Sequence, residues 1–368
     1  MKNINIQFIG SSRFEAARSV EILPKGHKSR NLHGHSFWAS IISQSKDNYS
    51  LLGTEHTKLK KTLENVTEHL DYAHLNRIIK IPTDANLAKW VKDECKSLLQ
   101  KNIQITGLQS TKDQGVHLGS DDNLHVWKRF QFEAAHKLPN VEKDHKCGRM
   151  HGHSFRVIIH ASVHLKSQNL LADYEQLSKI WMPIDNLLNY SCLNEIQGLS
   201  NPTSELLAKW IWEKILPNLP CVSCVSVYET ESCGAHFDGK KFKIWKDFTI
   251  DSAIKFDSPD VKIGSLHGHT FLLRLNLSSS LNKVMGWTKD FGDVKELFRP
   301  IFNLLDHHPL HENIDIENKS LLGIAKWILK NTQTVLPEVS GIEFYETEGS
   351  GVILKNNFVG PAMPLTQK

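Results

Sequence analysis

The sequence is poor in cysteine and has no long apolar run, and both shortages exclude classes of protein. Six cysteines in 368 residues are too few for the disulfide framework of a small secreted domain. No window approaches the roughly 18 apolar residues that a membrane-spanning helix requires. The opening residues MKNINIQFIG also lack the apolar stretch of a signal peptide. We therefore expect a cytoplasmic protein with no membrane partner.

Charge of one sign is also in short supply. The net charge is only +4, and no run of lysine and arginine is long enough to form a nucleic-acid-binding arm, so we expect no nucleic-acid partner. The apolar content of 40% and the charged content of 23% are typical of a globular protein, and the length suffices for two or three domains. Twenty histidines are the one unusual abundance, and they suggest a metal site.

The chain consists of one unit written three times. The tripeptide His-Gly-His occurs at intervals of 118 and 116 residues, at His33–His35, His151–His153 and His267–His269. Other markers share this period, because RFEAA returns as QFEAA, and LAKW occurs twice and then a third time as IAKW. Independent markers with one period indicate tandem copies. The expected boundaries are 1–123 for unit one, 124–242 for unit two and 243–368 for unit three.

Each unit is predicted to contain two strands around His-Gly-His, two helices and a final pair of strands. The first helices are expected at Asp173–Met182 in unit two and at Asp290–Phe298 in unit three. The second helices should begin at Pro82-Thr83 and Pro202-Thr203, since proline suits a first helical turn. An Asp238-Gly239 turn should link unit two to unit three. The pattern predicts an α+β fold of antiparallel sheets with helices on one face.

Unit two places three histidines where they can share a metal ion. His151 and His153 are two residues apart in a predicted strand, so their imidazoles point to one face; His136 ends the preceding strand. Three imidazoles without a fourth protein ligand are typical of catalytic zinc, whose open position takes water or substrate. Cys147 lies four residues before His151, and a thiol near a dication becomes a reactive thiolate. Taken alone, the His-Gly-His pair is better explained as a turn, with His136 as a surface residue; the other features of the chain favour a metal site.

Four motifs of unit two, FEAAH, HKCGRMHGH, NPTSELLAKWIW and VYET, resemble the 6-pyruvoyl-tetrahydropterin synthase / 6-carboxytetrahydropterin synthase family. Units one and three resemble it more weakly. The resemblance implies the tunnelling fold (T-fold), in which three units close into a barrel and two barrels stack. Here the three units of one chain would form a pseudo-trimeric barrel, and two chains would form a homodimer. The interval between Cys147 and His151 resembles the carboxytetrahydropterin (QueD) branch.

The resemblance also implies roles for residues of unit two. It implies that Zn²⁺ is the cofactor and that the metal ligands are His136, His151 and His153. Cys147 would move a proton at the side chain of the substrate, and Glu229 of VYET would anchor the pterin ring. Thr203 and Glu205 would line the same pocket and bind substrate.

No single unit keeps every family residue. The catalytic Asp-His pair of the family falls on Asn189-Tyr190 in unit two, whereas unit three has Asp306-His307. Unit three, however, carries Ile254 in place of the first histidine and Ile263 in place of the thiol. Unit one has lost both halves, through Arg18, Ser29, Asp71-Tyr72 and Gln109. We therefore expect one composite site per chain, shared by units two and three, and about one tight zinc per chain.

The resemblance implies a zinc-dependent lyase that converts 7,8-dihydroneopterin triphosphate into 6-carboxytetrahydropterin, acetaldehyde and triphosphate. The alternatives are a pyruvoyl-type synthase, which eliminates triphosphate from the same substrate, and a non-catalytic zinc- or pterin-binding protein. The sequence leaves open whether Asp306-His307 acts within one chain or across two. It also leaves open whether the product serves queuosine-type deazapurines or another pterin pathway.

Overall fold

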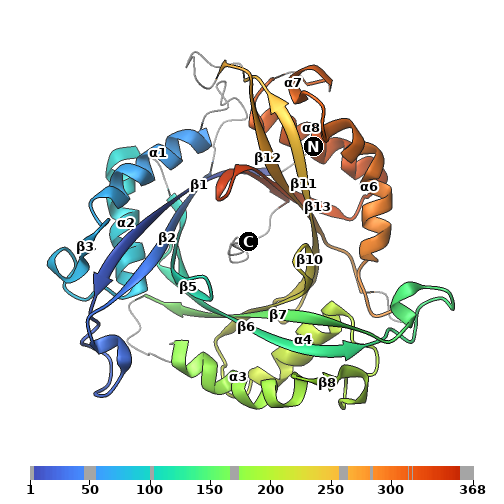
Figure 1. Cartoon of the computed structure of the whole chain (residues 1–368), viewed down its shortest axis with the longest axis horizontal. Helices are drawn as coiled ribbons and strands as arrows, with labels where there is room; N and C mark the ends of the chain where they lie inside the picture. Colours follow the sequence, from blue (N-terminus) through green and yellow to red (C-terminus); the bar gives the residue numbers. More distant parts are fainter. Residues whose placement is uncertain are drawn as a thin grey trace.

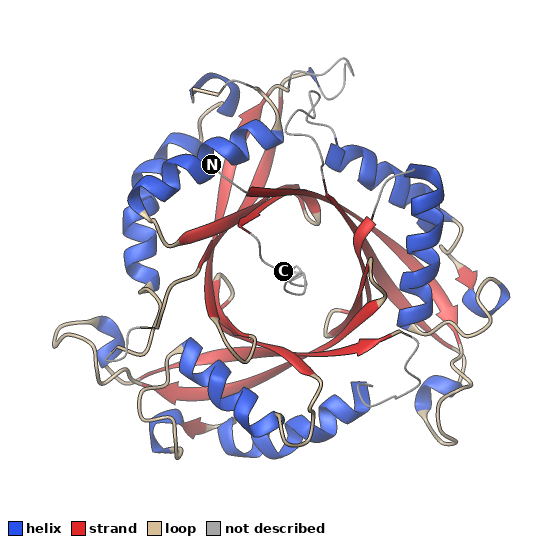
Figure 2. Cartoon of the chain, turned by 180° about the vertical axis from the view of Figure 1, so that it is seen from behind, coloured by secondary structure: helices blue, strands red, loops and turns tan. Residues whose placement is uncertain are grey.

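The chain forms a closed barrel of strands with helices around it. The computed structural model describes residues 4–44, 55–99, 103–165, 174–256, 264–281, 285–313, 315–316 and 318–356. The strands belong to one 14-stranded sheet, in which β3 (Ala73–His74) and β8 (Ser191–Cys192) have only two residues each, and the remaining twelve close the barrel. The helices lie on the outside of the ring (Figure 1, Figure 2). The expected T-fold barrel is therefore confirmed.

Each unit repeats the order strand, strand, helix, helix, strand, strand. Unit one contains β1 (Ile4–Arg18), β2 (His33–Gln44), α1 (Glu55–Glu68), α2 (Asp84–Leu99), β4 (Ile103–Thr111) and β5 (Gln114–Gly119). Unit two contains β6 (Asn123–His136), β7 (His151–His164), α3 (Tyr174–Leu188), α4 (Ser204–Ile215), β9 (Val222–Thr230) and β10 (Cys233–Phe237). Unit three contains β11 (Phe242–Ile254), β12 (His267–Leu277), α6 (Phe291–Leu305), the short α7 (Leu310–Asn313), α8 (Leu321–Val335), β13 (Val339–Thr347) and β14 (Ser350–Asn356).

The barrel has three seams, and they differ in how the chain crosses them. The β5–β6 and β10–β11 hairpins carry the backbone from one unit into the next. The expected turn before β11 is present, with Gly239 in the left-handed region at φ 88°, where glycine has no steric penalty. The third seam joins opposite ends of the described chain, because β14 pairs with β1 from Ile4↔Asn356 to Ile9↔Gly351. No backbone connection closes this seam; hydrogen bonds, side-chain packing and the ion pair of Arg13 with Glu348 do so.

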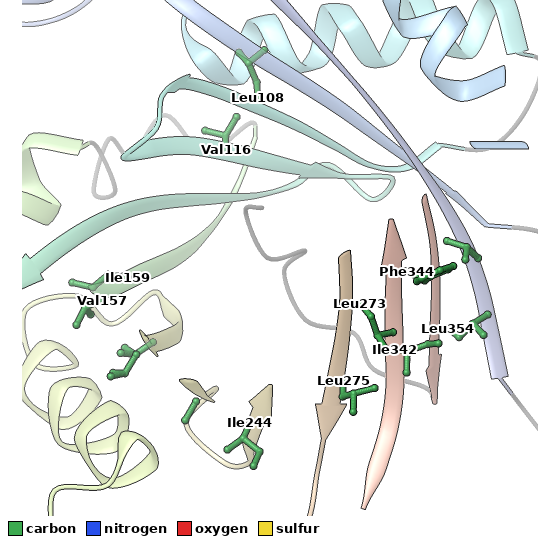
Figure 3. Packing of buried hydrophobic residues seen from close by; sticks show 14 of the residues in the cluster. Leu108, Val116, Val157, Ile159, Ile244, Leu273, Leu275, Ile342, Phe344 and Leu354 are labelled. Carbon is green, nitrogen blue, oxygen red and sulfur yellow. The ribbon is translucent and has the colours of Figure 1, made fainter. Parts of the chain in front are cut away.

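Alternation along each strand separates a core face from an inner face. Leu273 and Leu275 of β12 are fully buried in the layer between the strands and the helices, as successive side chains point to opposite faces. Figure 3 shows them beside Ile342 and Phe344 of the adjacent strand β13. Arg274, which lies between the two leucines, points to the barrel interior. None of the described helices is long and apolar enough to cross a membrane.

Two helices run further than the sequence predicts. The expected ends at Met182 and Phe298 are wrong, because α3 contains Pro183 and α6 contains Pro300 inside the helix. A proline removes one backbone hydrogen bond, but here the apolar stripe remains buried after each proline, at Ile184, Leu188, Ile301 and Leu305. Packing against the sheet therefore outweighs the local cost of proline. Asp173, the expected start of the first helix in unit two, lies outside the described residues.

Candidate active site

The His136 cluster lies at one end of the β6–β7 hairpin. His136 is paired with His151 across the two strands, and His153 is paired with Ala134. The ring of His136 lies 4.5 Å from that of His151 and 5.2 Å from that of His153, measured between centroids. The expected two-residue spacing thus places both imidazoles of the His-Gly-His strand on the face that His136 shares.

Backbone carbonyls orient two of these imidazoles. Nδ1 of His136 lies 3.1 Å from the carbonyl oxygen of Pro202, and Nδ1 of His151 lies 2.7 Å from that of Arg149. A carbonyl can only accept a hydrogen bond, so each Nδ1 carries the proton and each Nε2 keeps its lone pair for a metal. His136 is completely buried, and its Nε2 has no hydrogen-bond partner; Nε2 of His153 is also buried without one. This donor set fits a zinc ion.

Glu229 completes the cluster from strand β9. Its Oε2 accepts a hydrogen bond of 2.6 Å from the Ser204 hydroxyl, and its Oε1 lies 3.5 Å from Nε2 of His153. One ligand atom from each of His136, His151, His153 and Glu229 lies within 4.8 Å of all the others. The carboxylate can therefore face either a metal ion or a ligand held beside one.

Cys147 lies in a short 3-10 turn, Lys146–Gly148, just before the His-Gly-His strand. Burial raises the pKa of its thiol above the ordinary value, and the carboxylates of Glu229 and Asp290 raise that pKa further. The half-buried thiol thus faces the same carboxylate that closes the histidine cluster. We use "unit-two pocket" below as the name for the group of side chains His136, His151, His153, Glu229 and Cys147.

Thr203 and Glu205 hold unit three against this pocket. Thr203 caps α4 and donates a 2.6 Å hydrogen bond to the carbonyl of Gly286, while Glu205 accepts one of 2.6 Å from the backbone N–H of Thr288. Burial raises the pKa of Glu205 to about 7. Both residues are buried at the seam between units, which makes them positioning residues for the segment 285–290.

The start of α4 corrects one expectation and explains another. Pro202 lies before the N-cap residue Thr203 and not in the first helical turn, so the predicted place of proline is wrong. Its carbonyl accepts from His136, which is a role that sequence spacing does not reveal. The only available signal was that a Pro-Thr pair precedes the second helix in both unit one and unit two.

The Asp306-His307 pair lies elsewhere. Nδ1 of His307 is 2.8 Å from Oδ2 of Asp306, and this hydrogen bond and charge raise the pKa of His307. The side chain of His307 is 75% exposed. The 15 residues of α6 span about 22 Å between this pair and Asp290 beside Cys147. This length of helix keeps the pair away from the unit-two pocket of the same chain.

All three units share the same backbone turn at the position of the Asp306-His307 pair. Oδ1 of Asp306 accepts from the backbone N–H of Asp251, as Asp71 and Asn189 accept from the corresponding strands in units one and two. The next residue in each unit has a positive φ, 52° at Tyr72, 54° at Tyr190 and 57° at His307. The first position of the pair is therefore structural in every unit, and only the exposed second position differs in chemistry.

Unit one replaces the histidine cluster by a buried ion pair. Nη1 of Arg18, in the place of His136, lies 2.9 Å from the carbonyl of Pro82 and 2.6 Å from Oδ1 of Asp84. The other Asp84 oxygen accepts hydrogen bonds from Ser110 and from Tyr174 of unit two. Burial opposes ionisation of Asp84, but Arg18 and these donors hold its pKa below the usual value. A cation thus occupies the space that a metal would need.

Unit three retains a smaller cluster. Ile254 stands in the place of His136 and is fully buried, while Ile263, expected in the place of the thiol, lies outside the described residues. Ligand atoms of His267, His269 and Glu346 nevertheless lie within 4.8 Å of one another. His56 of unit one contacts Glu346, and no sequence motif predicts that contact.

Comparison with known proteins agrees with the threefold repeat. A family model described as 6-pyruvoyl tetrahydropterin synthase matches residues 9–114, 125–240 and 243–357. The chain is 39% identical over 119 residues to the 6-carboxy-5,6,7,8-tetrahydropterin synthase of Synechocystis sp., an alignment that covers 30% of this chain and 91% of that protein. It is 29% identical over 104 residues to the dihydroneopterin monophosphate aldolase of Pyrococcus furiosus, covering 28% and 85%.

Solved structures of this group are also similar to one unit at a time. The 6-pyruvoyl tetrahydropterin synthase of Caenorhabditis elegans aligns with 18% identity and a TM-score of 0.28, covering 30% of this chain and 90% of that one. Each of these relatives is matched over most of its own length by about a third of this chain.

Proposed function

Since the chain belongs to the 6-pyruvoyl tetrahydropterin synthase family, we propose that it is a 6-carboxy-5,6,7,8-tetrahydropterin synthase-like lyase. Its substrate is 7,8-dihydroneopterin triphosphate, its cofactor is Zn²⁺, and its single catalytic centre is the unit-two pocket. All six cysteines are free thiols, which fits the reducing cytoplasm as its location.

One observation carries this proposal. Among the described residues, the unit-two pocket alone combines three imidazoles with a nearby thiol and a carboxylate. Unit one has an ion pair in the same place, and unit three has an isoleucine. The 39% identity to a 6-carboxy-5,6,7,8-tetrahydropterin synthase supports the same reaction for the intact pocket.

The histidine ligands and the thiol have different roles in the proposed reaction. A zinc ion on His136, His151 and His153 would polarise the hydroxyls of the substrate side chain and favour the thiolate of Cys147. Without a cation, burial and two carboxylates keep this thiol protonated. Cys147 then accepts the proton that leaves the substrate carbon, because its sulfur borders the same pocket.

Glu229 binds the pterin ring. Its carboxylate is fixed by Ser204 through one oxygen and remains half-buried at the pocket wall. Two carboxylate oxygens match the adjacent N–H and NH₂ donors of a pterin edge. Thr203 and Glu205 hold segment 285–290 at the pocket edge and so shape the space available to the substrate.

A second chain supplies the Asp-His pair. His307 is exposed beside the His-Gly-His end of unit three, because its backbone N–H bonds Asp251 of the adjacent strand. Exposed apolar residues precede His-Gly-His in every unit, with exposed fractions of 65% at Leu32, 53% at Met150 and 64% at Leu266. This repeated apolar surface is suited to burial against another barrel. In a stacked homodimer, His307 of one chain serves Cys147 of the other.

Product analysis tests the reaction. The chain, loaded with Zn²⁺ and given 7,8-dihydroneopterin triphosphate, should release acetaldehyde and form 6-carboxytetrahydropterin, and Cys147→Ala should abolish both. A 6-pyruvoyl product without acetaldehyde would establish the pyruvoyl-type alternative. Binding without any product would leave only the zinc- or pterin-binding alternative.

Mixing two inactive variants tests the origin of the Asp-His pair. Cys147→Ala and His307→Ala should each lose turnover alone. After exchange of chains in an equal mixture, half of the dimers are mixed and each holds one intact site, so about a quarter of the wild-type turnover should return. No recovery from two inactive variants, or full activity of His307→Ala, would contradict action across chains.

A further inference from the structure

Three potential metal ligands of unit three lie close together in the structure. Nε2 of His269 lies 3.0 Å from Oε1 of Glu346, and Nδ1 of His267 lies 2.7 Å from the carbonyl of Ser265. That carbonyl fixes the proton on Nδ1 and leaves Nε2 of His267 with a lone pair. Ligand atoms of the two histidines and the glutamate all lie within 4.8 Å of one another.

The fourth member of this cluster comes from unit one. Nε2 of His56, in the first turn of α1, lies 2.6 Å from Oε2 of Glu346. His56 is only 3% exposed, and its contact with Glu346 is partly buried. It joins residues 290 positions apart and crosses the seam that no hairpin bridges. One carboxylate therefore contacts His56 of unit one through Oε2 and His269 of unit three through Oε1.

Glu346 differs from Glu229 in what holds it. The alignment of LAKW in unit two with IAKW in unit three places Leu321 where unit two has Ser204, so the serine donor is missing. His56 takes over the bond to the carboxylate, and it comes from a different unit. The buried Ile254 removes the third imidazole, leaving two histidines and one carboxylate as the donor set.

We propose that His267, His269 and Glu346 bind a second divalent transition metal ion, and that His56 of unit one holds Glu346 in place for it. Two histidines and one carboxylate form a recognised ligand set for zinc and iron(II). His56 acts as a positioning residue, since a hydrogen bond to a ligating carboxylate orients it and strengthens binding. The ion, Glu346 and His56 then form a continuous link across the β14–β1 seam.

A link at this seam has a clear physical consequence. The other two seams are continuous in the backbone, whereas β14 and β1 separate whenever the pairing from Ile4 to Ile9 breaks. His56 can hold Glu346 only when the barrel is closed, so an ion that binds more tightly to the held carboxylate stabilises the closed barrel by mass action. Zn²⁺ in the unit-two pocket would also stabilise the fold, but its histidine ligands lie in the β6–β7 hairpin, away from the β14–β1 seam.

Metal counting on the full-length chain tests the proposal. After dialysis against a chelator, Zn²⁺ is added and unbound ion removed, and elemental analysis should give two ions per chain. His267→Ala should hold one ion, as should His151→Ala, and the double variant none. His33→Ala, at the same position in unit one, is the matched control and should keep two. His56→Phe should weaken the second ion by about 10- to 100-fold.

Stability provides a second measurement. Zn²⁺ should raise the thermal midpoint of His151→Ala, which keeps only the second ion, and it should not raise that of the His151→Ala/His267→Ala double variant. One ion per chain that is lost in His151→Ala and unaffected in His267→Ala would overturn the proposal and leave only a hydrogen-bonded chain of His56, Glu346 and His269. This outcome would leave the proposed lyase activity untouched, since that activity depends on the unit-two pocket.

Discussion

Units two and three share the His-Gly-His motif but differ in the residues that surround it. Both have His-Gly-His at the start of a strand and a glutamate near the end of a later one. In unit two, His136 and Ser204 from the same unit complete the cluster. In unit three, Ile254 replaces the histidine, and His56 reaches the glutamate from another unit. The neighbours of a motif, and not the motif, therefore decide which chemistry each copy can perform.

Removal of a metal ligand should have the largest effect, and it should affect unit two and not unit one. His151→Ala in unit two should lower turnover by at least about a thousandfold, since it removes a ligand of the metal that stabilises developing negative charge. His33→Ala, which changes the same motif in unit one, should leave turnover unchanged. Steady-state acetaldehyde release at fixed Zn²⁺ measures both variants, and equal losses would mean that unit one also takes part.

Unit one extends the comparison to a copy without a metal cluster. Arg18→Ala should lower the free energy of unfolding by about 3–5 kcal/mol, because it leaves the buried Asp84 carboxylate without its cation. Lys89→Ala is the control, as it breaks an exposed pair with Asp93, which contributes about 0.3–0.5 kcal/mol. Urea denaturation at pH 7 measures the difference, and similar midpoints for the two variants would contradict the structural role of Arg18.

The seam beside the unit-two pocket should respond to pH. Glu205 has a folded-state pKa of about 7, above its ordinary value of 4.5, so its protonated form favours the fold. Its contribution is complete below pH 4.5 and is lost as pH rises to 7, a change of about 3 kcal/mol. Glu205→Gln should remove this part of the slope in urea midpoints between pH 5 and 8. Unit three has Leu322 at the aligned position, so it offers no equivalent ionisation.

The pterin anchor should give the smallest of these effects. Glu229→Gln should weaken binding of the pterin substrate by about 10- to 100-fold, because it replaces a charge-assisted pair of hydrogen bonds by a mismatched amide. Glu231→Gln is the control, because that side chain is exposed and pairs with Arg156 outside the pocket. Equal affinities of the two variants, measured by titration calorimetry, would remove Glu229 from the site.

Local patterns predicted the fold and the proximity of the histidines in unit two. Repeated markers indicated three copies, and a two-residue interval in a strand placed His151 and His153 on one face, as the β6–β7 pairing confirms. The expected helix ends at Met182 and Phe298 were wrong because burial of an apolar stripe outweighs the cost of Pro183 and Pro300. The strand spacing and the helix ends were both predicted from short-range patterns. Only the helix ends also depend on tertiary packing, which a short-range pattern does not contain.

The sequence did not predict contacts between segments that are far apart in the chain. His56 bonds Glu346 across 290 positions, and Tyr174 bonds Asp84 across 90; neither pair belongs to a motif. The sequence also supplied the Asp306-His307 pair without its position, which is set by the length and direction of α6. Motifs identify candidate residues, whereas the closure of the barrel determines which of them meet.

The number of pterin sites per chain distinguishes a single catalytic centre in unit two from one centre in every unit. Titration calorimetry of the Zn²⁺-loaded Cys147→Ala chain with 7,8-dihydroneopterin triphosphate measures binding without turnover. We expect one site per chain, whose affinity is weakened by a further Glu229→Gln substitution. Three sites per chain, or one site whose affinity survives that substitution, would contradict the claim that the unit-two pocket is the single catalytic centre.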